Sequence, residues 1–218
     1  MASRFAGTVA ALLFAATVQA QDSGPYIGAS VGQSRAKLDT APLDALVVGD
    51  SPVTVTEDHH TGGKVFLGYR INQYFAVEGG YADLGQFKAS ANFFITVGFF
   101  PGPPSTSAIP EHFTIKANGA FLSGLGGVPF LERGLVYAKL GVHDMKVELT
   151  SDIGCTNCPE GQPKSNTNVG PVYGAGVQYT RASHVGIRAE WERFGKAGGD
   201  STGKHDFDLF TVGLFFHF

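Results

Sequence analysis

The chain has 218 residues, of which 43% are hydrophobic, 12% aromatic and 16% charged, with 30 glycines and 18 phenylalanines. A typical globular protein is about 25% charged, so this chain is poor in charge. Its 16 Lys and Arg against 19 Asp and Glu give a net charge of −3, with no basic block. The composition excludes a nucleic-acid-binding surface, which needs clustered cations, and a disordered chain, which has few hydrophobic residues.

The N-terminal segment has the pattern of an export signal. Arg4 supplies a positive charge before an apolar run at residues 5–18, and Val18-Gln19-Ala20 matches the small-x-small site of signal peptidase. The alternative is a membrane anchor, but the run is shorter than the roughly 20 residues that a spanning helix needs. We therefore expect residues 1–20 to be a cleaved signal peptide and residues 21–218 to form one domain outside the cytoplasm.

Eight later segments alternate apolar and polar residues with a period of two, which predicts β-strands rather than helices. In chain order they are residues 26–33, 64–71, 75–84, 112–123, 135–149, 169–180, 184–194 and 206–218. In the fourth segment we assign Ile115, Ala117 and Phe121 to the apolar outer face and Lys116 to the opposite face. A soluble sandwich of two sheets would alternate in the same way, so the period alone leaves the fold open.

The composition of the two faces favours a closed membrane barrel over a sandwich. One face carries mostly Gly and Ala with about one charge per strand, which suits the narrow lumen of an eight-stranded barrel. The other face has no charge along the middle of each segment, as lipid requires. The charges that we expect to point into the lumen are Lys64, Arg70, Glu78, Lys116, Lys139, Arg188, Glu190 and Glu192.

The connections between the segments also fit a membrane barrel. Residues 72–73 and 181–183 form very short turns, whereas the alternate connections are long: 35–62, 85–111, 150–168 and 195–205. Short turns on one side and long loops on the other are typical of outer-membrane barrels. The connection at 124–132 fits this pattern least well. We predict an all-β, up-and-down antiparallel transmembrane barrel of eight strands, with short periplasmic turns and long external loops.

The two cysteines, Cys155 and Cys158, lie in a Gly- and Pro-rich stretch of one long loop. A C-x-x-C spacing is compatible with a redox pair, half of a zinc site or a disulfide. No βαβ pattern surrounds the pair, and no second C-x-x-C or H-x-x-x-H supplies two more zinc ligands. Because an exported chain meets an oxidising compartment, we expect a local disulfide in this loop.

Several motifs resemble the transmembrane domain of the outer-membrane protein A family. Tyr26-Ile-Gly-Ala-Ser-Val-Gly32 is similar to its first strand, Phe75-Ala-Val-Glu-Gly-Gly-Tyr81 to its third, and Val185-Gly-Ile-Arg-Ala-Glu-Trp191 to its seventh. Leu214, Phe216 and Phe218 resemble the C-terminal signal read by the barrel-assembly machinery. The resemblance covers residues 21–218 and implies a barrel in the lipid of the cell outer membrane, with no cofactor. It does not extend to the periplasmic peptidoglycan-binding domain that members of the family often carry.

The resemblance also implies a charged gate inside the barrel. Glu78 and Arg188 match the family's central ion pair, and Lys116 matches its lysine on a looser motif. The carboxylate of the sixth strand, with which that lysine would alternate, is Gln178 here. An amide attracts an ammonium less strongly than a carboxylate does, and Glu190 is the candidate replacement.

The functional expectation is a structural and surface-interaction role through the external loops, with a host or cell-surface ligand as partner. Six large apolar residues lie in one supposedly exposed loop: Phe93, Phe94, Ile95, Val97, Phe99 and Phe100. They favour a partner surface or a rim in the lipid headgroups. The alternative, to which the β-prone composition gives a slight edge, is that the flanking strands extend above the membrane and pair there.

Two other functions remain as alternatives. A narrow, low-conductance pore gated by the luminal charges is one, although wide channels need about 16 strands. A lipid-modifying enzyme is the other, but Ser183 and His184 are adjacent and would diverge on a strand, and no G-x-S-x-G or H-E-x-x-H is present. His59 and His60 with Asp58 form a weak metal candidate. We therefore expect no enzymatic activity and no metal.

Overall fold

The computed structural model describes residues 23–37, 54–57, 59–97, 105–153, 164–181, 184–199 and 203–218. Their elements are β-strands: β1 (Gly24–Lys37), β2 (Thr54–Glu57), β3 (His59–Arg70), β4 (Phe75–Val97), β5 (Ser105–Phe130), β6 (Gly134–Ile153), β7 (Lys164–Thr180), β8 (Val185–Gly199) and β9 (Gly203–His217). No helix long and apolar enough to cross a membrane occurs among these residues.

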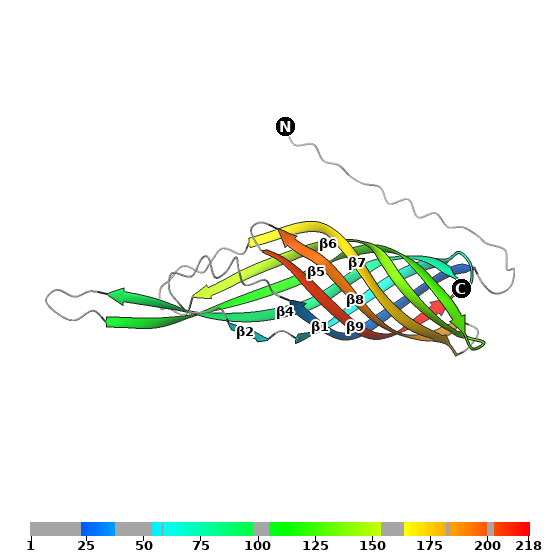
Figure 1. Cartoon of the computed structure of the whole chain (residues 1–218), viewed down its shortest axis with the longest axis horizontal. Coiled ribbons are helices and arrows are strands. Elements are labelled where there is room, and N and C mark those ends of the chain that lie inside the picture. The colour runs from blue at the N-terminus through cyan, green and yellow to red at the C-terminus, as the bar shows by residue number, and fades with distance from the viewer. Residues whose placement is uncertain are drawn as a thin grey trace, which may run out of the picture.

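Eight of the strands close into a barrel (Figure 1). The order around the wall is β4-β3-β1-β9-β8-β7-β6-β5, and a further pairing of β4 with β5 completes the circle. Every pairing is antiparallel, including the seam in which β1 meets β9 from Tyr26↔His217 to Lys37↔Asp206. The predicted eight-stranded up-and-down barrel is therefore confirmed. Closure leaves no free edge along the wall, so all of the backbone groups there can be paired.

Short turns join the strands at the end of the barrel that carries the C-terminus (Figure 1). The Asn72 side chain fixes the first of them, because its Oδ1 accepts hydrogen bonds from the backbone N–H groups of Tyr74 and Phe75, each at 2.8 Å. β5 continues to Phe130, so the connection predicted at 124–132 shrinks to a turn at residues 131–133. The connection that fitted least well thus becomes one of the short turns.

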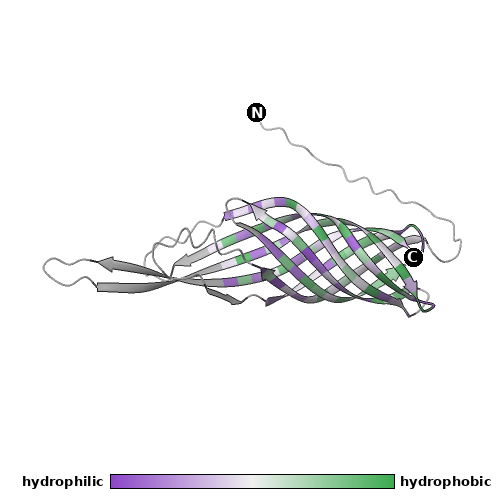
Figure 2. Cartoon of the chain, viewed as in Figure 1, coloured by the Kyte–Doolittle hydropathy of each residue, from purple (hydrophilic) through white to green (hydrophobic). Residues whose placement is uncertain are grey.

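The wall alternates as expected along most strands. On β9, Val212 and Leu214 are exposed on the outside, whereas Thr211 and Phe215 are buried inside. Figure 2 shows that hydrophobic residues dominate the part of the wall near the turns and the C-terminus. The barrel therefore has an apolar outer surface and an interior filled by side chains, which is the arrangement that eight strands permit.

The assignment of faces on β5 was wrong. Ile115, Ala117 and Phe121 point into the barrel and are at most 4% exposed, whereas Leu122 faces outward and is 57% exposed. Lys116 is likewise exposed on the outside. The rule that charges point inward holds only where a strand crosses lipid, and the interior of a narrow barrel also takes aromatic side chains. Lys116 therefore leaves the predicted luminal set.

Aromatic and aliphatic side chains fill the interior on both sides of its middle. Tyr26, Phe66 and Phe215 lie nearer the turns, with the Tyr26 ring 6.3 and 6.4 Å from the other two. Toward the other end the fully buried side chains include Phe87, Phe194, Phe207, Leu84, Leu209, Ile115 and Met145. At the turn end, a pocket of about 10 Å³ borders Tyr26, Arg70 and Gln178, which is room for about one water.

β4 and β5 continue past the other strands as a two-stranded hairpin (Figure 1). The β5–β6 ladder ends at Glu111↔Ile153, but β4 and β5 stay paired to Val97↔Ser105. β2 pairs with β4 from Thr54↔Ser90 to Glu57↔Lys88, beyond the Gly63↔Asp83 pair where the β3–β4 ladder ends. The interpretation of residues 85–111 as extended strands is therefore confirmed for 85–97 and 105–111. Phe99, Phe100, Cys155 and Cys158 lie outside the described residues.

Candidate functional site: a neutral charge cluster in the lumen

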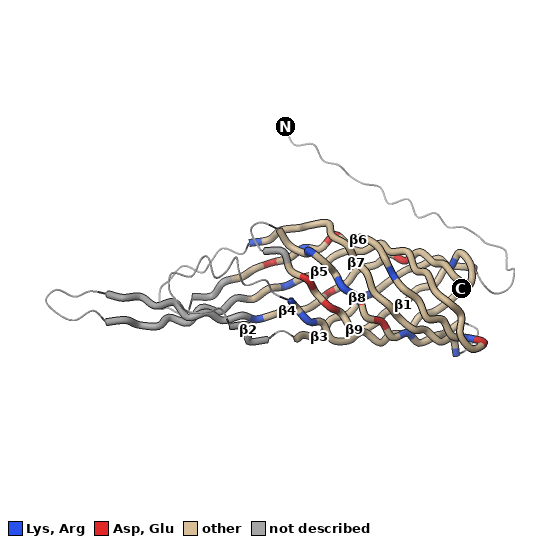
Figure 3. The backbone as a smooth tube through the Cα atoms, in the orientation of Figure 1, with Lys and Arg blue, Asp and Glu red and all other residues tan. Residues whose placement is uncertain are grey.

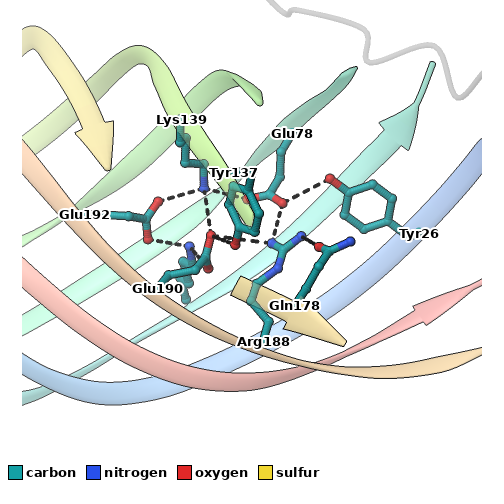
Figure 4. Close-up of polar contacts among 9 residues, drawn as sticks. Tyr26, Glu78, Tyr137, Lys139, Gln178, Arg188, Glu190 and Glu192 are labelled. Atoms are coloured by element: carbon teal, nitrogen blue, oxygen red, sulfur yellow. Dashed lines mark hydrogen bonds and ion pairs between the residues drawn. The ribbon is translucent and has the colours of Figure 1, made fainter. Parts of the chain in front are cut away.

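Six charged side chains meet in the middle of the barrel (Figure 4). They are Lys64 on β3, Glu78 on β4, Lys139 on β6, and Arg188, Glu190 and Glu192 on β8. All are at most 6% exposed. The three residues of β8 reach one site because alternate residues of a strand point to the same face. Three cations and three carboxylates make the cluster neutral in its ionised form.

Glu78 joins two of the cations. Its Oε1 lies 2.6 Å from Lys139 Nζ and its Oε2 2.6 Å from an Arg188 guanidinium nitrogen. The Tyr26 hydroxyl donates a further hydrogen bond to Oε2 at 3.2 Å. Arg188 also donates to Gln178 Oε1 at 3.1 Å. A carboxylate that accepts from three side chains on β1, β6 and β8 ties opposite parts of the wall together.

Glu190 and Glu192 bind the two lysines of the cluster. Lys64 Nζ lies 2.6 Å from Glu190 and also donates to Glu192, while Lys139 Nζ lies 2.7 Å from Glu192. The Tyr137 hydroxyl donates to Glu190 at 2.6 Å. Lys139 therefore bridges Glu78 and Glu192, whereas Lys64 bridges the two carboxylates of β8.

Aromatic rings surround the cations. The Arg188 guanidinium lies 4.5 Å from the centroid of the Phe66 ring, and Lys139 Nζ lies 4.7 Å from that of Phe121. Such contacts favour a buried cation because the ring face is negative. Burying a charge costs several kcal/mol unless it is paired and hydrogen-bonded, and here ion pairs, hydroxyl groups and rings all offset that cost.

The comparisons with known proteins give the family. Residues 6–218 match the outer membrane protein beta-barrel domain family. The chain belongs to this family. It is 27% identical over 217 residues to outer membrane protein A of Shigella dysenteriae, covering 97% of this chain and 54% of that protein. Over 211 residues it is 27% identical to outer membrane protein A of Salmonella typhi, covering 94% and 52%. The chain thus spans about half the length of these curated relatives.

A solved structure agrees with the fold. Neisserial surface protein A is 15% identical, with a TM-score of 0.52 over 91% of this chain and all of that one. The predicted resemblance and the predicted location in the outer membrane are confirmed by the family. The strands of this outer-membrane barrel therefore cross lipid, and the charge cluster lies inside the membrane, screened from lipid by the wall.

The outer wall of the barrel changes from apolar to polar along each strand. On β6 the outward residues Val136, Leu140 and Val142 give way to Lys146 and Glu148. These two side chains form an ion pair at 2.5 Å, and the hydrogen bond from Lys146 holds the pKa of the Glu148 carboxyl below its usual range. Charged residues lie toward the hairpin end, at the turns and, as the luminal charge cluster, between them (Figure 3).

A cluster of aromatic and charged side chains lies on β7, β8 and β9 of this outer-membrane barrel. Arg193 on β8 binds Asp208 on β9 through two hydrogen bonds of 2.7 Å, and the Trp191 indole donates to Asp208 at 3.1 Å. Tyr173 packs edge-on against Trp191 at 6.2 Å. Aromatic girdles of this kind lie at the membrane interfaces of outer-membrane barrels.

The structure brings together most, but not all, of the residues that the sequence singled out. Lys64, Glu78, Lys139, Arg188 and Glu190 lie in the cluster, whereas Arg70 points into the lumen nearer the turns and is partly exposed. Sequence reasoning did not single out Tyr26 and Tyr137 as partners of the carboxylates. The signal was present in their position, because each alternates in phase with luminal residues of its strand.

The other residues singled out from the sequence lie on the surface of the barrel. Leu214, Phe216 and Phe218 face outward at the turn end, where Phe218 N–H donates to Pro25 O at 3.1 Å. That the barrel-assembly machinery recognises these residues stays a prediction. His59 and His60 are exposed on β3, and Asp58 lies outside the described residues. Among the residues described, no three His, Cys, Asp or Glu side chains group as a metal site.

Proposed function

We propose that the protein is a sealed membrane barrel that presents the β4–β5 hairpin and its external loops to a partner at the cell surface. The observation that carries this proposal is the filled lumen. The charge cluster crosses the interior from β3 and β4 to β6 and β8 (Figure 4). The Phe66 and Phe121 rings lie against its cations, and Phe194 packs edge-on against Phe121. A barrel whose interior is filled by side chains interacts with other molecules through its outer surface and loops.

The hairpin supports a role in binding. A two-stranded hairpin alone is at best marginally stable in water, yet β4 and β5 hold their register for residues 92–97 and 105–110 beyond the rest of the barrel. One arm carries Phe93, Phe94 and Ile95, which pair with Ile109, Ala108 and Ser107. An apolar arm held above the membrane is suited to covering by a partner protein.

The sealed lumen predicts an electrical result. Refolded protein in a planar lipid bilayer should give no steady conductance steps, because ion pairs and aromatic rings fill the middle of the lumen. Insertion is checked independently by the resistance of the folded barrel to protease. Stable unitary channels from fully inserted wild-type protein would contradict the proposal and would move the narrow gated pore ahead of it.

The hairpin predicts a second result. Replacing Phe93, Phe94 and Ile95 together by Ser should reduce attachment of cells displaying the protein to an epithelial monolayer at least tenfold, while the barrel still folds. Replacing Thr106 and Ser107 on the facing arm by Ala is the matched control and should leave attachment unchanged. If the Ser variant attaches normally, the hairpin is not the binding surface; if it fails to fold, the phenylalanines serve the fold instead.

We further propose that the chain has no enzymatic activity. The His184 ring stacks on Phe216, with centroids 5.7 Å apart and planes at 19°, which is a packing role rather than that of a general base. His143 is buried, with Nε2 2.8 Å from the Gly195 carbonyl oxygen. Ser183, the partner considered for His184, lies outside the described residues.

A further inference from the structure

A polar hollow of about 380 Å³ lies on the outside of the barrel wall, away from the charge cluster and below the hairpin. Strands β1, β3, β4 and β5 form it. Its lining includes Val31, Thr61, Asp83, Gln86, Lys116 and Asn118. Lys116, which the sequence assigned to the lumen, lies at this site.

The strand register arranges the lining in rows across the wall. Val31, Gly63, Asp83 and Asn118 are successive partners in one row. The row nearer the turns is Ala29, Val65, Tyr81 and Ala120, and its members Val65 and Tyr81 are 58% and 49% exposed. The Gln86↔Lys116 pair lies on the hairpin side. The hollow is therefore polar on the side toward the hairpin and bordered by apolar residues on the side toward the turns.

Two local features of the backbone create the hollow. Gly63 contributes no side chain to the row between Val31 and Asp83, and a bulge interrupts the β4–β5 ladder between Asp83 and Gln86. Asp83 Oδ1 holds the bulge by accepting from the N–H of Gly85 at 2.8 Å. Gly85 has a φ of 82°, and a Cβ there would lie 2.2 Å from the His60 ring. The site is thus built into the fold.

The chemistry of the lining indicates its ligand. The Lys116 ammonium suits a phosphate, and the Asp83 carboxylate with the Gln86 and Asn118 amides suits sugar hydroxyls. The apolar row below suits acyl chains. A phosphorylated sugar joined to acyl chains combines these three chemistries, and the hollow lies where the outward residues of the wall change from apolar to polar.

We propose that this hollow binds the phosphorylated sugar headgroup of a glycolipid of the outer leaflet. Lys116 pairs with the phosphate, and Asp83 accepts hydrogen bonds from the sugar hydroxyls. Asn118 donates to the sugar through its amide N–H groups, because its Oδ1 already accepts from the Tyr81 hydroxyl at 3.0 Å. The acyl chains lie along Val65 and the Tyr81 ring. The binding site is separate from the hairpin and from the lumen, so it holds or fails independently of the proposed surface role.

The test uses the full barrel in phosphatidylcholine nanodiscs that contain graded amounts of bis-phosphorylated lipid A, an acylated glucosamine disaccharide. Native mass spectrometry counts the glycolipid retained per barrel. Wild-type protein should retain one molecule specifically. Lys116→Gln, which removes the cation, and Thr61→Trp, which fills the hollow from β3, should each weaken retention at least tenfold. Lys164→Gln, the same charge change on exposed β7, should leave it unchanged.

Two results would overturn the proposal. Equal retention by wild type, Lys116→Gln and Thr61→Trp would mean that glycolipid associates with the wall without a site. Displacement of the glycolipid by millimolar inorganic phosphate would mean that the hollow is a simple anion site that does not recognise the sugar. In a parallel experiment, wild-type protein should retain dephosphorylated lipid A as weakly as the Lys116→Gln variant retains lipid A. All variants carry exposed substitutions, and protease resistance checks that each remains folded.

Discussion

Replacing Glu78 by Gln should lower the free energy of unfolding by about 3–5 kcal/mol, the usual cost of removing one partner from a buried ion pair. Glu78 is fully buried and lies 2.6 Å from both Lys139 and Arg188. The amide keeps the shape of the side chain but leaves the cluster with three cations and two carboxylates. Urea unfolding of the barrel in phospholipid vesicles, followed by tryptophan fluorescence, measures the loss.

A carboxylate outside the barrel provides the matched control for this change. Glu148→Gln breaks an ion pair of similar length, with Lys146, but that pair is solvated, so the loss should stay below about 1 kcal/mol. Equal losses for the two variants would contradict the assignment of Glu78 to a buried network.

A double-mutant cycle separates the pair from its surroundings. Glu78→Gln and Arg188→Gln together should cost less than the sum of the two single changes, with a coupling energy of about 0.5–3 kcal/mol, as expected for residues in contact. If the losses of the two single variants simply add, the direct pairing of the two side chains is contradicted.

Phe121→Ala should lower the free energy of unfolding by about 3–5 kcal/mol, as for other large-to-small changes in a packed interior. The ring is 4% exposed, and Lys139 Nζ lies 4.7 Å from its centroid. The substitution therefore opens a cavity beside a buried cation and removes a favourable contact with it. The same urea titration measures the effect.

The neighbour of Phe121 provides the control, because it tests which face of β5 is inside. Leu122 is 57% exposed on the outer wall, where lipid fills the space that a smaller side chain leaves. Leu122→Ala should thus cost less than half as much as Phe121→Ala. A larger loss for Leu122→Ala than for Phe121→Ala would support the opposite assignment of faces, in which Phe121 points outward.

Most of the fold is readable from the sequence because two simple rules act along the strands. The period of two places the faces of β1, β3, β4 and β6–β9, and the Asn72 turn marks the periplasmic side. β5 breaks the second rule, that charges face inward, since both of its faces carry apolar residues and Lys116 is exposed on the outer wall, where that wall becomes polar. Hydrophobicity does not distinguish a phenylalanine that packs in the lumen from one that faces acyl chains.

The partners within the charge cluster were harder to predict than its members. Lys64 and Glu192 are 128 residues apart, and Lys139 and Glu78 are 61 apart. These contacts cross the barrel rather than follow its ladders, so they depend on the width of the lumen and the reach of each side chain. Tyr26 and Tyr137 meet their carboxylates across one intervening strand, because Tyr26, Gly68 and Glu78 lie in one row of the register, and so do Tyr137, Gly176 and Glu190.

The distribution of the cluster over β3, β4, β6 and β8 has a consequence for how the chain enters the membrane. In an open sheet Lys139 can still contact Glu192, because both lie in one row with Gly174 of β7. Lys64 reaches Glu190, and Arg188 reaches Glu78, only when β1 meets β9. Charged side chains that lack these partners near lipid are costly, so the last step of neutralisation favours closing the seam and inserting the barrel as one cooperative event.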